Sequence, residues 1–75
     1  MATDATIAVM SQVIKAFQIR QAEINSNWDK LAGGGDLRAA EALAASTIAA
    51  QADLATLGVL AGKLTGTLSA RAAGV

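Results

Sequence analysis

The chain has 75 residues, so it holds one domain at most, and its six basic and six acidic residues give a net charge of zero. It contains no Cys, His, Tyr or Pro. Disulfides and thiolate sites are therefore excluded, and so are the commonest general base and metal ligand. With as many acidic as basic residues, the chain lacks the concentration of basic residues that nucleic-acid binding requires. We therefore expect no enzyme, no catalytic, cofactor or metal site, and no nucleic-acid partner.

A first helix is predicted from about residue 4 to residue 32. Its residues are mostly good helix formers, and its bulky side chains recur in steps of three and four. This heptad spacing is typical of a helix that packs along another helix, and Gln21 is the polar member of the repeat. The predicted contact residues of this helix are Ile7, Met10, Ile14, Phe17, Ile24, Trp28 and Leu31.

A turn is predicted at residues 33–35, where three glycines follow one another. The first of them, Gly33, can take the left-handed conformation that ends a helix, and Gly34 and Gly35 continue the connection. Asp36 then suits the N-cap of the next helix, with its carboxylate at the positive end of the helix dipole.

A second helix is predicted over about residues 36–70. It again carries a heptad pattern, in which Thr47, Ala50 and Ala61 complete the repeat. The short connection favours an antiparallel pair, so the predicted fold is all-α, a single helical hairpin spanning residues 1–75. The bulky contact residues predicted on this helix are Leu43, Leu54, Leu57, Leu64 and Leu68.

A second pattern on this helix consists of small residues four positions apart. An interior glycine costs a helix roughly 0.5–1 kcal/mol relative to alanine, and the usual compensation is close approach by a neighbouring helix. We therefore expect an intersubunit contact along this stripe. Its predicted members are Ser46, Ala50, Gly58, Gly62 and Gly66.

Two helices alone leave much of each apolar helix exposed. The apolar residues off the predicted contact rows are Val9, Val13, Ile19, Ile48, Val59 and Leu60. Such side chains would face water in an isolated hairpin, and chains of this size have little stability to spare. The sequence therefore predicts a homo-oligomer of many copies, with the hairpin assembling into a helical homopolymer.

The chain resembles the needle-filament subunits of bacterial type III secretion systems. The resemblance rests on the short turn at residues 31–37, the alanine-rich start of the second helix at 39–51, and the Lys-bearing, leucine-spaced end at 60–68. It covers nearly the whole chain in organisation more than in identities, and the Pro that the family usually carries in its turn is absent here.

The resemblance implies a two-helix subunit of a hollow extracellular filament through which unfolded effector proteins pass. It implies that Lys63, Thr67 and Arg71 face the lumen, and that secretion-base, tip or chaperone proteins are further partners. It also implies a secreted or cell-surface protein that lacks a cleaved signal peptide.

Two other functions remain open on the sequence. The hairpin can be a small dimerisation or adaptor module, in which case it is cytoplasmic, or a coat protein of a filamentous particle. Insertion into a membrane is not expected, because Asp53 places a charge near the centre of the second helix. The charge-free runs of that helix also fall short of the roughly 20 residues that a membrane-spanning helix needs.

Overall fold

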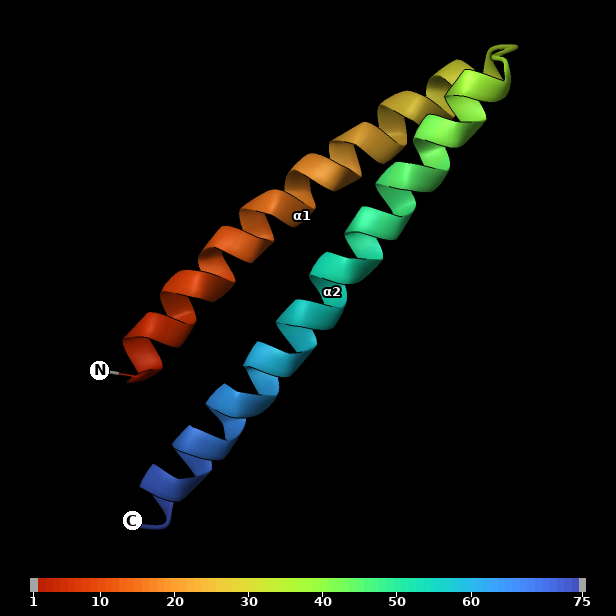
Figure 1. Cartoon of the computed structure of the whole chain (residues 1–75). Helices are drawn as coiled ribbons and strands as arrows, with labels where there is room; N and C mark the ends of the chain where they lie inside the picture. The colour runs from red at the N-terminus through yellow and green to blue at the C-terminus, as the bar shows by residue number, and fades with distance from the viewer. Residues whose placement is uncertain (1, 75) are drawn as a thin grey trace.

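The computed structural model describes residues 2–74, and within them the chain forms two long helices and a tight turn. Helix α1 runs over Ala2–Ala32 and helix α2 over Leu37–Ala72. They lie antiparallel and side by side, with both chain ends at the far end from the turn (Figure 1). The predicted all-helical hairpin is confirmed. Helix α1 begins about two residues before its predicted start and ends at residue 32 as predicted. Helix α2 ends about two residues beyond its predicted end, and Asp36 lies just outside its start.

The turn is held by backbone hydrogen bonds and by one side-chain cap. The amide of Gly33 donates to the carbonyl of Asp29, and those of Gly34 and Gly35 both donate to the carbonyl of Leu31. Gly34, rather than Gly33 as predicted, takes the positive φ of 95°. The Gly33 amide still bonds to the carbonyl four residues earlier, as in a helix, so the left-handed residue comes one position later than expected.

Gly35 matters for a different reason, because the chain passes very close to the end of α1 at this point. A Cβ atom added to Gly35 would lie 2.5 Å from the backbone carbonyl oxygen of Lys30. Asp36 then caps α2: its Oδ1 accepts a hydrogen bond from the amide of Ala39 at 3.3 Å. The cap predicted from the sequence is thus confirmed.

Two heptad rows on each helix form the contact within the hairpin. One pair of rows, the central rows, was predicted from the sequence. Their residues are Met10, Phe17, Ile24 and Leu31 on α1, and Leu43, Ala50, Leu57 and Leu64 on α2. The companion pair, the closed rows, was not predicted. Their residues are Thr6, Val13, Arg20 and Asn27 on α1, and Ala39, Ser46, Asp53 and Leu60 on α2. All these residues are buried or partly buried. Val13 and Leu60 were expected on the outer faces of the helices and instead lie in this contact.

The structure corrects the prediction for the other half of the heptad pattern. We call the remaining predicted rows the open rows. They were expected to lie with the central rows inside the hairpin, but they lie to one side of the contact instead. Ile7, Ile14, Trp28, Leu54 and Leu68 are all exposed. The physical reason is that each central row has an apolar neighbour on one side and a more polar one on the other, and two helices alone can cover only one of them. Gln21, Thr47 and Ala61 complete the open rows, which are therefore Ile7, Ile14, Gln21 and Trp28 on α1, and Thr47, Leu54, Ala61 and Leu68 on α2.

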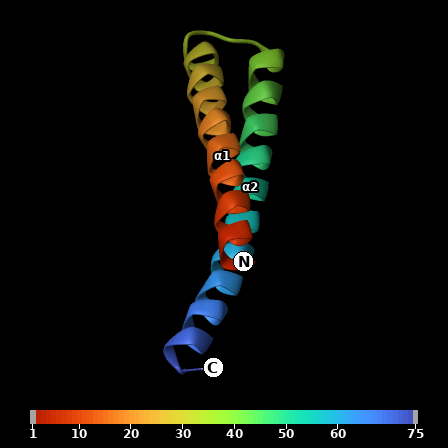
Figure 2. The same ribbon diagram turned by 90° about the vertical axis from the view of Figure 1, so that its left-hand side faces the viewer.

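The hairpin is long and thin and has almost no interior. Its Cα atoms extend over 59 × 15 × 13 Å, and their radius of gyration is 17.2 Å. A compact domain of this length would have a radius of gyration of about 11 Å. Only Ser46 and Ala50 are buried among the residues whose side chains are described. Figure 2 shows the same narrow pair of helices from the side.

Replacing Asp36 tests the cap. We expect Asp36→Ala to lower the free energy of unfolding by about 1 kcal/mol, because the amide of Ala39 loses its acceptor. Asp36→Asn should retain most of the stability, since Asn caps helices nearly as well. Thermal unfolding followed by circular dichroism at fixed protein concentration measures both. Equal losses in the two variants would show that charge, and not the cap, is what Asp36 supplies.

Candidate functional site

The candidate site is a surface rather than a pocket. It is the side of the hairpin formed by the central and open rows, which we call the open face. Phe17, Gln21 and Ile24 of α1 line one shallow hollow on it together with Thr47 and Leu54 of α2. Side chains from both helices therefore share this face. None of the residues in the central and open rows is charged.

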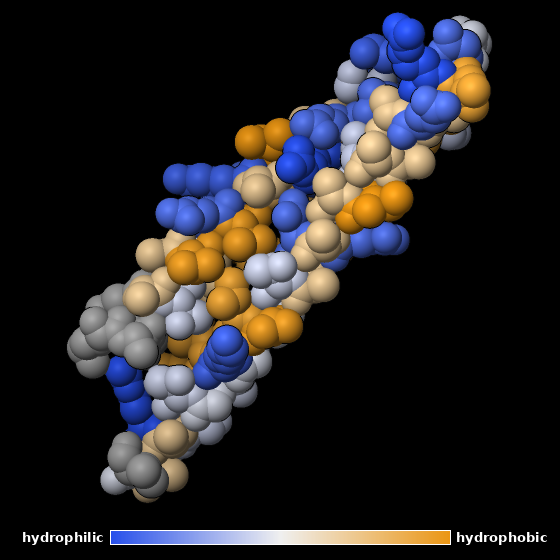
Figure 3. Space-filling model, viewed as in Figure 1, coloured by the Kyte–Doolittle hydropathy of each residue, from blue (hydrophilic) through white to orange (hydrophobic). Residues whose placement is uncertain are grey.

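A second hollow continues the open face towards the chain ends. It is lined by Ile7, Met10 and Ile14 of α1 and by Leu64 of α2, together with the polar side chains of Ser11, Lys15 and Gln18. The space-filling view shows apolar residues gathered along the middle of the hairpin between the two helices, with hydrophilic residues near the turn and at several points along both edges (Figure 3). The open face thus combines bulky side chains from both helices along most of the hairpin.

The opposite side of the hairpin, the polar face, is built on the closed rows. The Asn27 Nδ2 group donates a hydrogen bond of 3.0 Å to Ser46 Oγ, which links a side chain of α1 to one of α2. Ser46 Oγ in turn donates to the carbonyl of Ala42 at 2.9 Å. A polar pair inside a helical contact favours one register over others, because slippage would separate the two groups.

One heptad further from the turn, the same register brings Arg20 opposite Asp53. Arg20 Nη1 lies 3.5 Å from Glu23 Oε1 on its own helix. The Nε of Arg20 and the Oδ2 of Asp53 are both shielded from solvent and make no hydrogen bond within the described residues. Opposite charges therefore face the contact from both helices, and a change of register would move each of them towards apolar neighbours.

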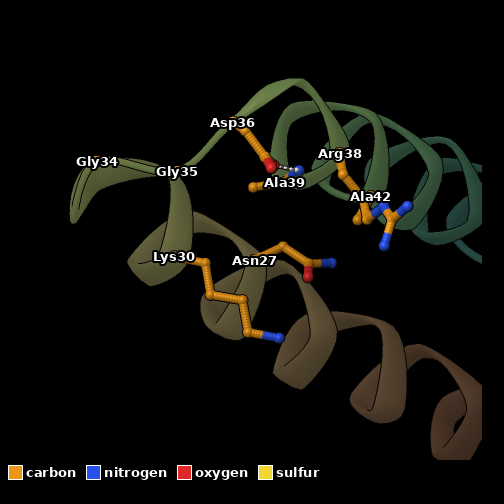
Figure 4. A pocket seen from close by; sticks show the side chains of 8 residues that line it. All are labelled: Asn27, Lys30, Gly34, Gly35, Asp36, Arg38, Ala39 and Ala42. Atoms are coloured by element: carbon orange, nitrogen blue, oxygen red, sulfur yellow. Dashed lines mark hydrogen bonds between the residues drawn. The ribbon is translucent and has the colours of Figure 1, made fainter.

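A third hollow, of about 450 Å³, lies beside the turn. Asn27 and Lys30 of α1 and Arg38 of α2 line it, and Figure 4 shows the Asp36 carboxylate turned back to the Ala39 amide. The acid is therefore engaged in capping. Lys30 and Arg38 are exposed, so this hollow is an open, solvated part of the surface.

The predicted small-residue stripe is divided between two environments. Ser46 and Ala50 are each only 6% exposed and face α1, so they contribute to the hairpin and are not available to another copy. Gly58, Gly62 and Gly66 have no atom within 4 Å of an added Cβ. The reason is geometric: residues four apart advance by about 40° around a helix, so the track winds from the inner side of α2 to its outer side.

The outer side of α2 carries a second heptad row, of which the predicted stripe contained only Gly62 and Gly66. Exposed, uncharged residues recur there in alternating steps of four and three, which is again a heptad pattern. We call this row the outer row. Sequence inspection could have found it by following Ile48 and Val59 with heptad steps instead of steps of four. Its residues are Ile48, Ala52, Ala55, Val59, Gly62 and Gly66.

The residues predicted to face a lumen lie together near the end of α2. Lys63, Thr67 and Arg71 are all exposed and four residues apart. The hydroxyl of Thr67 donates to the carbonyl of Lys63 at 3.1 Å, so it is engaged along its own helix. Among the residues that the structure describes, no acidic group of three or more is placed to hold a metal ion.

Helix α2 is also long and apolar enough, by length and composition alone, to cross a membrane. Helices from the cores of soluble proteins satisfy the same criterion. Asp53 lies near the middle of α2 and would be placed inside the hydrocarbon, where an acidic group is strongly unfavourable. The expectation of no membrane insertion stays a prediction.

Comparison with known proteins gives no relative. No protein family, no curated protein and no solved structure matches the chain. The interpretation of the open face and of the outer row therefore rests on their own chemistry.

A double-mutant cycle tests whether the polar pair contributes to the hairpin. We expect Asn27→Ala and Ser46→Ala together to show a coupling energy of about 0.5 to 1 kcal/mol, because each single variant already removes the shared hydrogen bond. Thr56→Ala combined with Asn27→Ala is the matched control, since the Thr56 hydroxyl donates along its own helix, to the carbonyl of Ala52. The losses from these two substitutions should add. Chemical denaturation measures all the variants. Additive losses for Asn27 and Ser46 would contradict the assignment.

Proposed function

We propose that this chain is a structural subunit that assembles with many copies of itself into a helical filament. The observation that carries the proposal is the presence of two separate uncharged surfaces on α2: the open face, shared with α1, and the outer row. A subunit with two separate interaction surfaces can contact two neighbours at once, and repeated contacts that do not close generate open helical polymers.

The chemistry of the two surfaces fits this role. Bulky side chains such as Trp28 and Leu54 project from the open face, and each is more than half exposed. The outer row offers mostly Ala and Gly, which permit close approach of another helix. Monomeric proteins rarely expose large contiguous apolar areas unless a partner covers them.

The narrower proposal is a type III secretion-type needle that forms a conduit for unfolded effector proteins. It is supported by the resemblance in size, in helical organisation and in the end of the second helix. On this proposal the polar residues Lys63, Thr67 and Arg71 line the channel, and the filament lies outside the cell. An adaptor or dimerisation module would instead end at a small, fixed number of copies.

Gly62→Leu tests the outer row. The isolated hairpin should remain fully helical, because nothing lies within 4 Å of the Gly62 Cβ position and Leu is the better helix former. Assembly should fail, because the added side chain separates neighbouring subunits. Negative-stain electron microscopy of concentrated protein should therefore show uniform thin tubes for the natural chain and none for the variant.

Thr56→Leu provides the matched control. It adds a similar side chain at an exposed position of α2 that belongs neither to the open face nor to the outer row. Its filaments should form normally. Normal filaments from Gly62→Leu would remove the outer row from the interface, and a natural chain that stays a small oligomer at every concentration would overturn the filament proposal.

A further inference from the structure

We infer that the open face is an interface with a second copy of this chain, and that two hairpins meet face to face through it. The inference concerns one surface and one partner. It deepens the proposed function by naming a dimer as the first step of assembly, and it rests on that proposal only for the filament that follows. The dimer itself requires only the surface described above.

The hairpin exposes more surface than a compact protein of its mass. The solvent-accessible surface is 5158 Å². A compact monomer of 7.5 kDa would expose about 4,250 Å², so the hairpin exposes an excess of roughly 900 Å². A standard protein–protein interface buries about 800 Å² on each partner. Covering one face of the hairpin thus gives each chain the exposed area of a compact protein.

The residues of the open face have the heptad spacing of a helical-bundle core. The central and open rows of both helices keep alternating steps of three and four, which is the spacing of residues that point into the core of a helical bundle. Two such helices supply half of a four-helix core, and a second copy supplies the same half. The α1 part of the face, from Ile7 to Leu31, is about 36 Å long at the rise of an α-helix, which is long enough for a continuous core.

The open face also has little charge. The central and open rows carry no charged residue, so a second copy can cover them without desolvating an ion. Lys15 lines the hollow near the chain ends, but it is exposed, and its long side chain can keep the ammonium in water. Arg20 and Asp53 lie in the closed rows, and Glu23 contacts Arg20 there, away from the open face. A charged partner would find one lysine on the open face to recognise, whereas a copy with the same uncharged rows is a direct match.

Leu54→Glu tests the inference, with Ile19→Glu as the matched control. Both replace an exposed aliphatic residue, 52% exposed at Leu54 on α2 and 58% at Ile19 on α1, but only Leu54 lies on the open face, and Ile19 lies outside the outer row as well. Sedimentation equilibrium of the full chain, at concentrations below those at which tubes form, should show a monomer–dimer equilibrium. Leu54→Glu should weaken dimerisation by at least about 100-fold, since it buries an unpaired charge. Ile19→Glu should leave it within about threefold.

Trp28 supplies an independent readout, because it is the only tryptophan, is 56% exposed and lies on the open face. Its emission should shift to shorter wavelength as the natural chain dimerises, and should not shift in Leu54→Glu. If circular dichroism shows that Leu54→Glu has lost its helices, the milder pair Leu54→Ala and Ile19→Ala replaces it, with about a tenfold loss expected for Leu54→Ala alone.

A natural chain that is monomeric at every concentration would overturn the inference, as would equal dimerisation by Leu54→Glu. A Trp28 shift that appears only on adding phosphatidylcholine vesicles would assign the face to lipid and also overturn it. The filament proposal fails separately. Dimers without tubes would leave this inference standing and reject the filament, whereas tubes built without a dimer step would do the reverse.

Discussion

Two helices can cover only one strip of each other, and this limit governs the whole molecule. Both helices carry apolar residues over a wider arc than one neighbour can cover. The central rows meet inside the hairpin, and each must then leave one flanking row uncovered. Here the polar flanks face each other, where Asn27 and Ser46 form a hydrogen bond, and the apolar flanks remain in solvent. The two-helix topology therefore causes both the exposed hydrophobic area and the near absence of an interior.

Much of this fold could be predicted from the sequence, because local signals determine it. Three consecutive glycines and Asp36 placed the turn and the cap, and the heptad spacing identified the central rows. The choice of flanking row could not be predicted in this way. A heptad pattern shows which side chains belong to the widest apolar stripe, but it does not show which neighbour covers them. Ile14 and Leu54 fit that stripe better than Arg20 and Asp53 do, yet the polar residues lie inside the contact.

Small side chains help to explain that arrangement. Ala39, Ser46 and Ala50 let α2 approach α1 closely, and the aliphatic part of Arg20 can cover apolar surface while its guanidinium reaches Glu23. The same abundance of small residues limits the hydrophobic free energy that the hairpin gains by itself, because each buried alanine removes little area from water. The stability of the fold and the covering of its open face are thus linked: a partner that covers the face also stabilises the hairpin.

The absence of charge from the open face has a kinetic consequence. Oppositely charged surfaces attract one another over about a Debye length and so raise the rate of encounter, whereas uncharged surfaces meet by diffusion alone. Association through such a face proceeds at roughly 10⁵–10⁶ M⁻¹ s⁻¹ and changes little with ionic strength. At low concentration, encounters between hairpins are therefore slow. The local concentration of newly made chains, rather than the salt around them, would set the time at which the open face is covered.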